Sequence, residues 1–183
     1  MTYRIIRSNR RSLCAQIREG QLVVRAPKEA SQGEIERFLL KHKDWIEAHL
    51  TKAQEQKRAL EHCPKLTPEE VRALRAKAKK VIPERVAYYA PLIGVTYGKI
   101  TIRMQRSRWG SCTANGNLSF NALLMLAPLS VLDSIVVHEL CHRKQMNHSR
   151  RFYEEVLRVY PAYRQERRWL TKNGHLLFAS VSK

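Results

Sequence analysis

The chain of 183 residues lacks several features that would place it in common protein classes. It has no apolar run of the ~20 residues that a transmembrane helix requires, which excludes a membrane-spanning helix. The N-terminal stretch Met1-Thr2-Tyr3-Arg4 has no apolar signal region, so we expect a cytoplasmic rather than an exported protein. The chain also has no internal repeat and no low-complexity tract, which excludes repeat architectures.

Paired cysteines are missing as well. The four cysteines are Cys14, Cys63, Cys112 and Cys141, and no two of them have the close spacing of a paired motif. This distribution fits a reduced cytoplasm better than a disulfide framework.

Acidic residues are scarce. Asp and Glu together number 16 against 34 Lys and Arg, which gives a formal net charge of +18. A charge of this size attracts polyanions such as nucleic acid, nucleotides, acidic proteins or anionic membrane surfaces. A nucleic acid or another polyanion is therefore a candidate partner of the basic surface.

We expect an α+β protein in two parts, residues 1–65 and 66–183. In the first part, short β-rich runs within residues 3–25 predict strands, broken at Ser8-Asn9 and at Glu19-Gly20. The stretch Ser31-Gln32-Gly33-Glu34 is a capping box, which predicts a helix running to a boundary at Cys63-Pro64.

The second part begins with a similar signal for the start of a helix. Thr67-Pro68-Glu69-Glu70 predicts the start of another helix, which Pro83 should kink or end. Asn115-Gly116 predicts a two-residue hairpin turn between strands at 109–113 and 117–121. The apolar run 129–137 predicts a further helix, with Ser130 and Asp133 as a capping pair.

The stretch His138-Glu139-Leu140-Cys141-His142 carries the strongest chemical signal in the chain. Residues four apart on an α-helix share a face and lie about 6 Å apart, so His138 and His142 can bind one Zn²⁺ through ring nitrogens. Glu139 then lies beside the metal, where its carboxylate can deprotonate zinc-bound water. Two solvated histidines are the alternative, but the motif follows an apolar run, and buried polar groups need partners. We therefore expect one zinc ion per chain.

A catalytic zinc takes three protein ligands and leaves one position for water. His148 follows His142 at the spacing of the HExxHxxGxxH motif of metzincins, but Gln145 stands in place of the glycine, which excludes a strict metzincin. Asn147 can supply the turn instead, and Ser149 can cap the next helix. The rival third ligands are the downstream carboxylates of Glu154, Glu155 and Glu166, of which Glu166 is the best spaced.

Short segments spread over nearly the whole chain are specific when taken together. They are residues 10–11, 25–27, 107–112, 121–128, 136–142 and 147–149, with Phe152, Pro161 and 169–170. In these segments the chain resembles the YgjP-like metallopeptidases, which are related to the SprT-like zinc proteases. The resemblance implies a zincin-like catalytic domain, a small antiparallel sheet with the HExxH helix, behind an N-terminal β-hairpin and helix region. It also implies that His138, His142 and His148 bind the metal and that Glu139 is the catalytic carboxylate.

These observations predict a zinc-dependent peptidase in which Glu139 takes a proton from water and passes it to the leaving amine. Peptides and proteins are then the substrates. A nucleoside triphosphate pyrophosphatase is the alternative, because the same zinc chemistry can attack phosphorus and the surroundings are basic. A nucleic-acid-associated protein that acts on DNA-bound proteins ranks third, since no base-reading motif is present. Oxyanion-stabilising candidates are Tyr153, Tyr163, His175 and the arginines, and Arg106 or Arg108 can hold a substrate carboxylate or phosphate.

Overall fold

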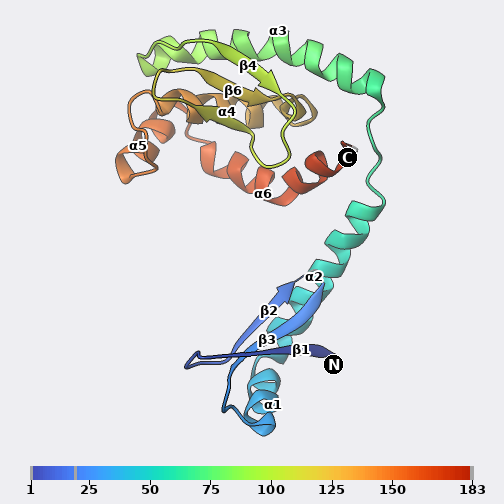
Figure 1. Ribbon diagram of the computed structural model, residues 1–183. Coiled ribbons are helices and arrows are strands. Elements are labelled where there is room, and N and C mark those ends of the chain that lie inside the picture. The colour runs from blue at the N-terminus through green and yellow to red at the C-terminus, as the bar shows by residue number, and fades with distance from the viewer. Residues whose placement is uncertain (1, 19, 182–183) are drawn as a thin grey trace. The chain divides into compact units, whose positions relative to one another are not determined.

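The computed structural model of the chain describes residues 2–18 and 20–181. Over these residues it has six strands, six α-helices and one 3₁₀-helix, so the predicted α+β class is confirmed. Contacts along the chain divide it into two compact units, Met1–Cys63 and Pro64–Lys183 (Figure 1). No helix of the described residues is both long and apolar enough to cross a bilayer.

The first unit is a three-stranded sheet with two helices. The central strand β3 (Gln21–Pro27) pairs in parallel with β1 (Tyr3–Ser8) and antiparallel with β2 (Cys14–Arg18). The helices α1 (Gln32–Lys41) and α2 (Lys43–Glu61) follow, and α2 packs on β2 and β3. The expected hairpin is therefore β2–β3, with β1 added to it. Of the predicted turn at its tip, Glu19 lies outside the described residues.

The start of α1 is the predicted capping box. The Ser31 hydroxyl accepts a hydrogen bond from the backbone N–H of Glu34, and the Glu34 carboxylate accepts one from the backbone N–H of Ser31. The single long helix that we expected is interrupted at His42, whose φ of -111° ends α1 and begins α2. This break lets Ile35 of α1 and Ile46 of α2 both be fully buried in the core of the first unit.

The second unit begins with the long helix α3 (Pro68–Ile93), which a second capping box starts, between Thr67 and Glu70. A small sheet follows with β6 (Leu118–Asn121) at its centre, between β4 (Ile100–Arg103) and β5 (Gly110–Cys112). The pairing of β4 with β6 is parallel and that of β5 with β6 is antiparallel, so the sheet is mixed and not purely antiparallel as expected.

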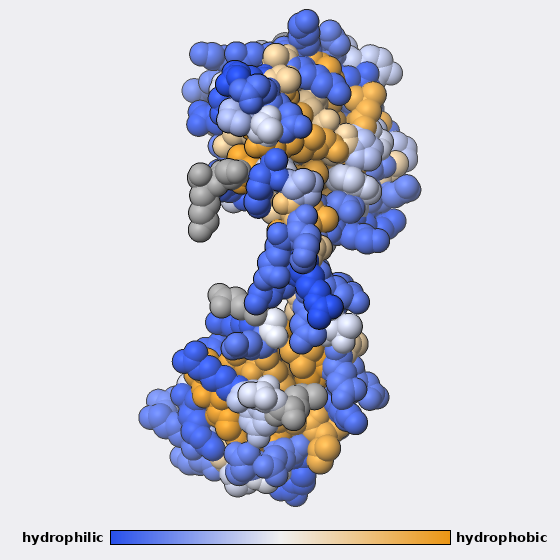
Figure 2. Space-filling model, turned by 90° about the vertical axis from the view of Figure 1, so that its right-hand side faces the viewer, coloured by the Kyte–Doolittle hydropathy of each residue, from blue (hydrophilic) through white to orange (hydrophobic). Residues whose placement is uncertain are grey.

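Three helices complete this unit after the 3₁₀ turn η1 (Ala122–Leu126). They are α4 (Leu129–Cys141), α5 (Arg150–Val159) and α6 (Tyr163–Ala179). In Figure 1, α4 lies between the sheet and α6, and it packs against α3, α5 and α6. Because α4 is surrounded, ten of its residues are buried, and it forms the centre of the core. On the face seen in Figure 2, hydrophilic residues cover most of the surface, with apolar patches between them.

Three local expectations in the second unit change. Of the two outcomes expected at Pro83, a kink or an end, the end does not occur, because α3 continues to Ile93 and stops at Gly94 in the left-handed region, with φ 75°. The β5–β6 connection is longer than two residues, because Thr113 donates to the carbonyl of Asn117 at 3.0 Å and Gly116 has φ 80°.

Asp133 does not cap α4. Its carboxylate instead accepts hydrogen bonds from Arg85 at 2.7 and 2.8 Å and from the hydroxyl of Tyr89 at 3.2 Å. These contacts join α4 to α3, and they pair the buried carboxylate of Asp133 with the guanidinium of Arg85.

Candidate active site

Three histidines meet at the C-terminal end of α4. His138 lies in the last turn of that helix, His142 is its C-cap residue, and His148 follows in the loop before α5. The ring centroids of these histidines are 4.8 to 5.0 Å apart. The Nε2 atoms of His138 and His148 are 3.0 Å apart. Sequence reasoning therefore selected side chains that the fold does bring together.

The three rings rest on one aromatic side chain. Phe152 of α5 is fully buried and its ring centroid lies 4.6 to 4.9 Å from those of His138, His142 and His148. α5 is fixed at this position by its N-cap, because the hydroxyl of Ser149 accepts a hydrogen bond from the backbone N–H of Phe152, as predicted. The cap thus sets both the loop that carries His148 and the ring beneath the cluster.

The outer nitrogens of two rings have protein partners. Nδ1 of His138 lies 2.8 Å from the hydroxyl oxygen of Tyr163 on α6, and Nδ1 of His142 lies 3.1 Å from the carbonyl oxygen of Gln145. Partners of this kind fix the tautomer that leaves Nε2 without a proton and able to bind a metal. Tyr163 therefore contacts His138 at the ring nitrogen opposite Nε2.

The electrostatics favour neutral imidazoles at His138 and His142. Burial, followed by the neighbouring His142 and His148, lowers the pKa of His138 to about 3. Burial is also the main cause that lowers the pKa of His142. Neutral imidazole is the form that binds metal ions. The ligand nitrogens all lie within 4.8 Å of one another, so this donor set fits one metal ion.

The rival carboxylate ligands lie elsewhere. Glu154 pairs with Arg150 at 2.8 Å, and Glu155 pairs with Lys144 at 2.6 Å. Glu166 is buried in α6. In the part of the chain that the structure describes, the only group with a metal-binding arrangement consists of His138, His142 and His148.

Glu139 lies beside the cluster and is shielded from solvent. It is only 5% exposed, and burial raises its pKa to about 8. Gly110, the first residue of β5, makes room for it: a Cβ built on Gly110 would lie 2.6 Å from Oε1 of Glu139 and 2.7 Å from its Cγ. No local pattern predicts this contact, since the two residues are far apart in the chain.

Two sets of contacts fix the segment that leads into β5. Asn121, at the end of β6, is 1% exposed, and its amide donates to the carbonyls of Gln105 and Arg108 at 2.7 and 2.9 Å. Trp109 stacks on Phe178 of α6 with ring centroids 4.2 Å apart and covers Gly174. These contacts explain the Trp109-Gly110 pair as structural support that places Gly110 against Glu139.

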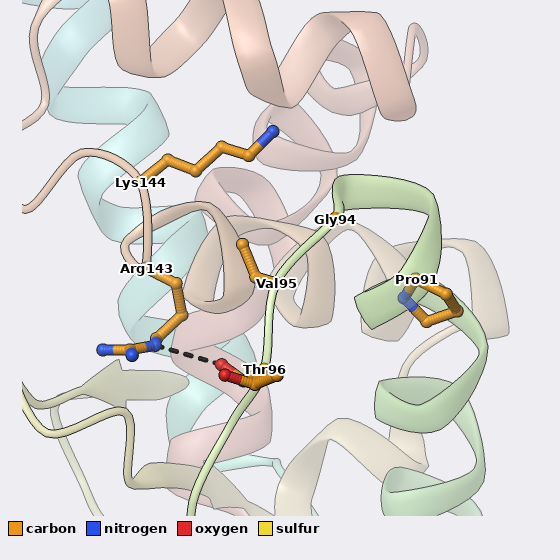
Figure 3. Close-up of a pocket in the computed structure, with 6 residues that line it drawn as sticks. All are labelled: Pro91, Gly94, Val95, Thr96, Arg143 and Lys144. Carbon is orange, nitrogen blue, oxygen red and sulfur yellow. Dashed lines mark hydrogen bonds between the residues drawn. The ribbon is translucent and has the colours of Figure 1, made fainter.

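The loop between His142 and His148 is anchored by Arg143. Its Nε donates to the carbonyl of Thr96 at 3.0 Å, which Figure 3 marks, and another guanidinium nitrogen donates to the carbonyl of Ala114 at 2.7 Å. Gly116 leaves space for the guanidinium, since a Cβ there would lie 2.9 Å from its central carbon. A hollow of about 520 Å³ lies here, and no residue of the histidine cluster lines it. Its lining is Pro91, Gly94, Val95, Thr96, Arg143 and Lys144.

A family model and two solved structures are similar to this chain. The model described as YgjP-like, metallopeptidase domain, matches residues 11–71 and 68–173. No curated protein matches. The metallopeptidase zymogen abylysin of Pyrococcus abyssi is 21% identical, with a TM-score of 0.46, and the match covers 50% of this chain and 94% of that one. The metallopeptidase zymogen jannalysin of Methanocaldococcus jannaschii is 19% identical, with a TM-score of 0.46, over 51% and 97% of the two chains.

Proposed function

Since the chain belongs to the YgjP-like metallopeptidase family and is a metal-dependent hydrolase, we propose that it is a zinc peptidase with Glu139 as its general base. The observation that carries this proposal is the cluster of three imidazoles beside a buried carboxylate. His138, His142 and His148 would hold the metal. A zinc ion bound by three imidazoles lowers the pKa of water and polarises a carbonyl.

Glu139 has the environment that a general base requires. Its carboxyl is nearly excluded from water, and its raised pKa, about 8, lies close to neutral pH, where proton uptake and release are both efficient. In the proposed reaction Glu139 takes a proton from the attacking water. It then gives that proton to the leaving amine, and the C–N bond breaks.

The edge strand β5 can align a peptide substrate. In the antiparallel pairing with β6, the carbonyl of Trp109 accepts a hydrogen bond from the backbone N–H of Asn121, and the backbone N–H of Thr113 donates one to the carbonyl of Asn117. The positions that hydrogen-bond to β6 therefore alternate along β5. Gly110 and Cys112 occupy the other positions, and their N–H and C=O groups point away from β6. An extended peptide can add to this edge next to Glu139.

Peptides are favoured over the alternatives. The family is one of metallopeptidases, and the only observation in favour of a nucleoside triphosphate is the basic charge, which an acidic peptide satisfies equally well. The same charge is also the only feature in favour of nucleic acid.

The test compares the zinc-loaded protein with Glu139→Gln on a peptide library and on a panel of nucleoside triphosphates. Wild-type protein should cleave peptides, and Glu139→Gln should lose about a thousandfold in kcat while it retains zinc. Glu154→Gln, which removes an exposed carboxylate of α5, is the matched control and should keep full activity. Nucleotide cleavage without peptide cleavage, or full peptidase activity in Glu139→Gln, would contradict the proposal.

A further inference from the structure

Helix α6 carries an excess of positive charge beside the histidine cluster. Its acidic residue Glu166 is buried, with 8% exposure, whereas its basic residues stand at the surface. The basic residues are Arg164, Arg167, Arg168 and Lys172. The helix therefore presents cations to solvent without internal compensation.

Arg167 of α6 follows Tyr163 by one turn, and residues four apart on a helix share a face. The hydroxyl of Tyr163 contacts Nδ1 of His138, so the N-terminal end of this face of α6 lies at the histidine cluster. Three turns along the same face, Gly174 packs under Trp109, which precedes Gly110 in β5. Arg167 thus stands between the cluster and the strand that we propose aligns the substrate.

The charge of Arg167 reaches the site. The positive charge of Arg167 acts on both Tyr163 and His138. The guanidinium is therefore within electrostatic range of both side chains.

The guanidinium of Arg167 is not engaged by the protein. Nearby cations have carboxylate partners: Arg158 and Lys144 share Glu155, and Arg150 pairs with Glu154. Among the described residues Arg167 is exposed and takes part in no ion pair or side-chain hydrogen bond. A guanidinium is a planar donor that binds carboxylates with two hydrogen bonds, so this one is available to a ligand.

The rest of the unit also favours an anionic substrate. Residues 64–183 contain 21 Lys and Arg against 8 Asp and Glu, a net charge of +13. Of these carboxylates, Asp133, Glu154 and Glu155 are paired with cations and Glu139 is buried. Little negative charge therefore remains near the site to repel a substrate carboxylate.

We propose that Arg167 binds a carboxylate of the peptide substrate, so that the enzyme selects peptides with Asp or Glu close to the scissile bond. This inference rests on the proposed peptidase function and names its substrate class. Arg167 acts as a specificity-determining residue, and the chemistry stays with Glu139.

The test uses a randomised decapeptide library, with cleavage sites read by mass spectrometry. Wild-type cleavage should enrich Asp and Glu over Asn and Gln near the scissile bond, and Arg167→Gln should abolish the enrichment. Arg168→Gln removes the same charge from the next residue, which points to another side of α6, and should preserve the preference. For a cleaved Glu peptide and its Gln analogue, kcat/KM should differ about tenfold in wild type, mainly through KM, and be equal in Arg167→Gln.

Binding gives a second readout. Zinc-loaded Glu139→Gln should bind the Glu peptide about tenfold more tightly than the Gln peptide in fluorescence anisotropy, and the added Arg167→Gln change should remove the difference. If Arg167→Gln and Arg168→Gln lost the preference for the Glu peptide equally, that preference would come from the overall positive charge of the surface. This result would overturn the inference. Cleavage with no acidic preference would overturn it alone, whereas absence of any peptide cleavage would overturn the proposed function as well.

Discussion

The hydroxyl oxygen of Tyr163 lies 2.8 Å from Nδ1 of His138, whose other ring nitrogen, Nε2, lies 3.0 Å from Nε2 of His148. This contact joins α6 to the last turn of α4 and orients a ring that would bind the metal. A side chain outside the HExxH motif therefore contributes to the geometry of the cluster.

Tyr163→Phe should weaken zinc binding about tenfold, because it removes the acceptor that holds His138 in the metal-binding tautomer. Competition with a chromophoric chelator measures this affinity. Tyr153→Phe is the matched control, since Tyr153 also lies beside the cluster, with its ring 6.2 Å from that of His148, but its hydroxyl does not contact a histidine. Equal zinc affinity of Tyr163→Phe and wild type would contradict this role.

Gly110→Ala should reduce peptidase activity about a hundredfold with zinc still bound. The added methyl group would overlap the Glu139 carboxyl group, at 2.6 Å from Oε1, and so displace the proposed base. Steady-state kinetics and metal analysis on the same sample measure the two effects. Gly33→Ala, on α1, is the control, because a Cβ there meets nothing within 4 Å. Retained activity in Gly110→Ala would mean that Glu139 tolerates displacement.

Removal of zinc should lower the melting temperature. A ligand that binds only the folded state stabilises it by about 4 kcal/mol at a thousandfold excess over its dissociation constant. His148→Ala should lose most of this zinc-dependent stabilisation, whereas His175→Ala, which changes a histidine outside the cluster, should keep it. Thermal unfolding with zinc and with EDTA checks the prediction. An unchanged zinc-dependent shift in His148→Ala would remove His148 from the ligand set.

Glu155→Gln should destabilise the protein more near neutral pH than in acid. Hydrogen bonding from Arg158, opposed by burial and aided by Lys144, lowers the pKa of Glu155 from 4.5 to about 2. The folded state thus favours the ionised carboxylate, which stabilises it above about pH 5, and this stabilisation disappears as the pH falls toward 2. Because Arg158 is half exposed, we expect a loss of only about 1–2 kcal/mol.

Urea unfolding of the metal-free protein near pH 7 and near pH 3 measures this difference between Glu155→Gln and wild type. Glu154→Gln is the control, since its partner Arg150 is almost fully exposed and the pair should contribute little. A loss of stability in Glu155→Gln that is the same at both pH values would show that packing, not charge, is responsible.

Local patterns predicted the local parts of the fold well. Both capping boxes, at Ser31 and Thr67, and the cap at Ser149 are present, because a cap depends on residues three positions apart. The clustering of His138, His142 and His148 was also predictable, since two of them are one helical turn apart. The break at His42 was not, because it depends on how α1 and α2 both reach one core.

The parts that the sequence did not predict depend on contacts between distant segments. The parallel pairing of β4 with β6 needs β5 to lie at the edge, which no local pattern encodes. In the sequence Asp133 resembles a capping residue, because its partner Arg85 lies far away in the chain, on α3. No local pattern distinguishes Tyr163, which contacts His138, from the other tyrosines. Tertiary packing decided each of these cases.

The anchoring of Arg143 to the carbonyls of Thr96 and Ala114 has a kinetic consequence. Protein contacts alone hold the start of the loop that leads to His148, so an arriving ion need not order the whole segment. The rate of metal exchange would then be set by ligand exchange at the ion, because the loop that leads to His148 need not unfold. Loss of the anchor in Arg143→Ala would make loop ordering part of each exchange event and slow the uptake of zinc.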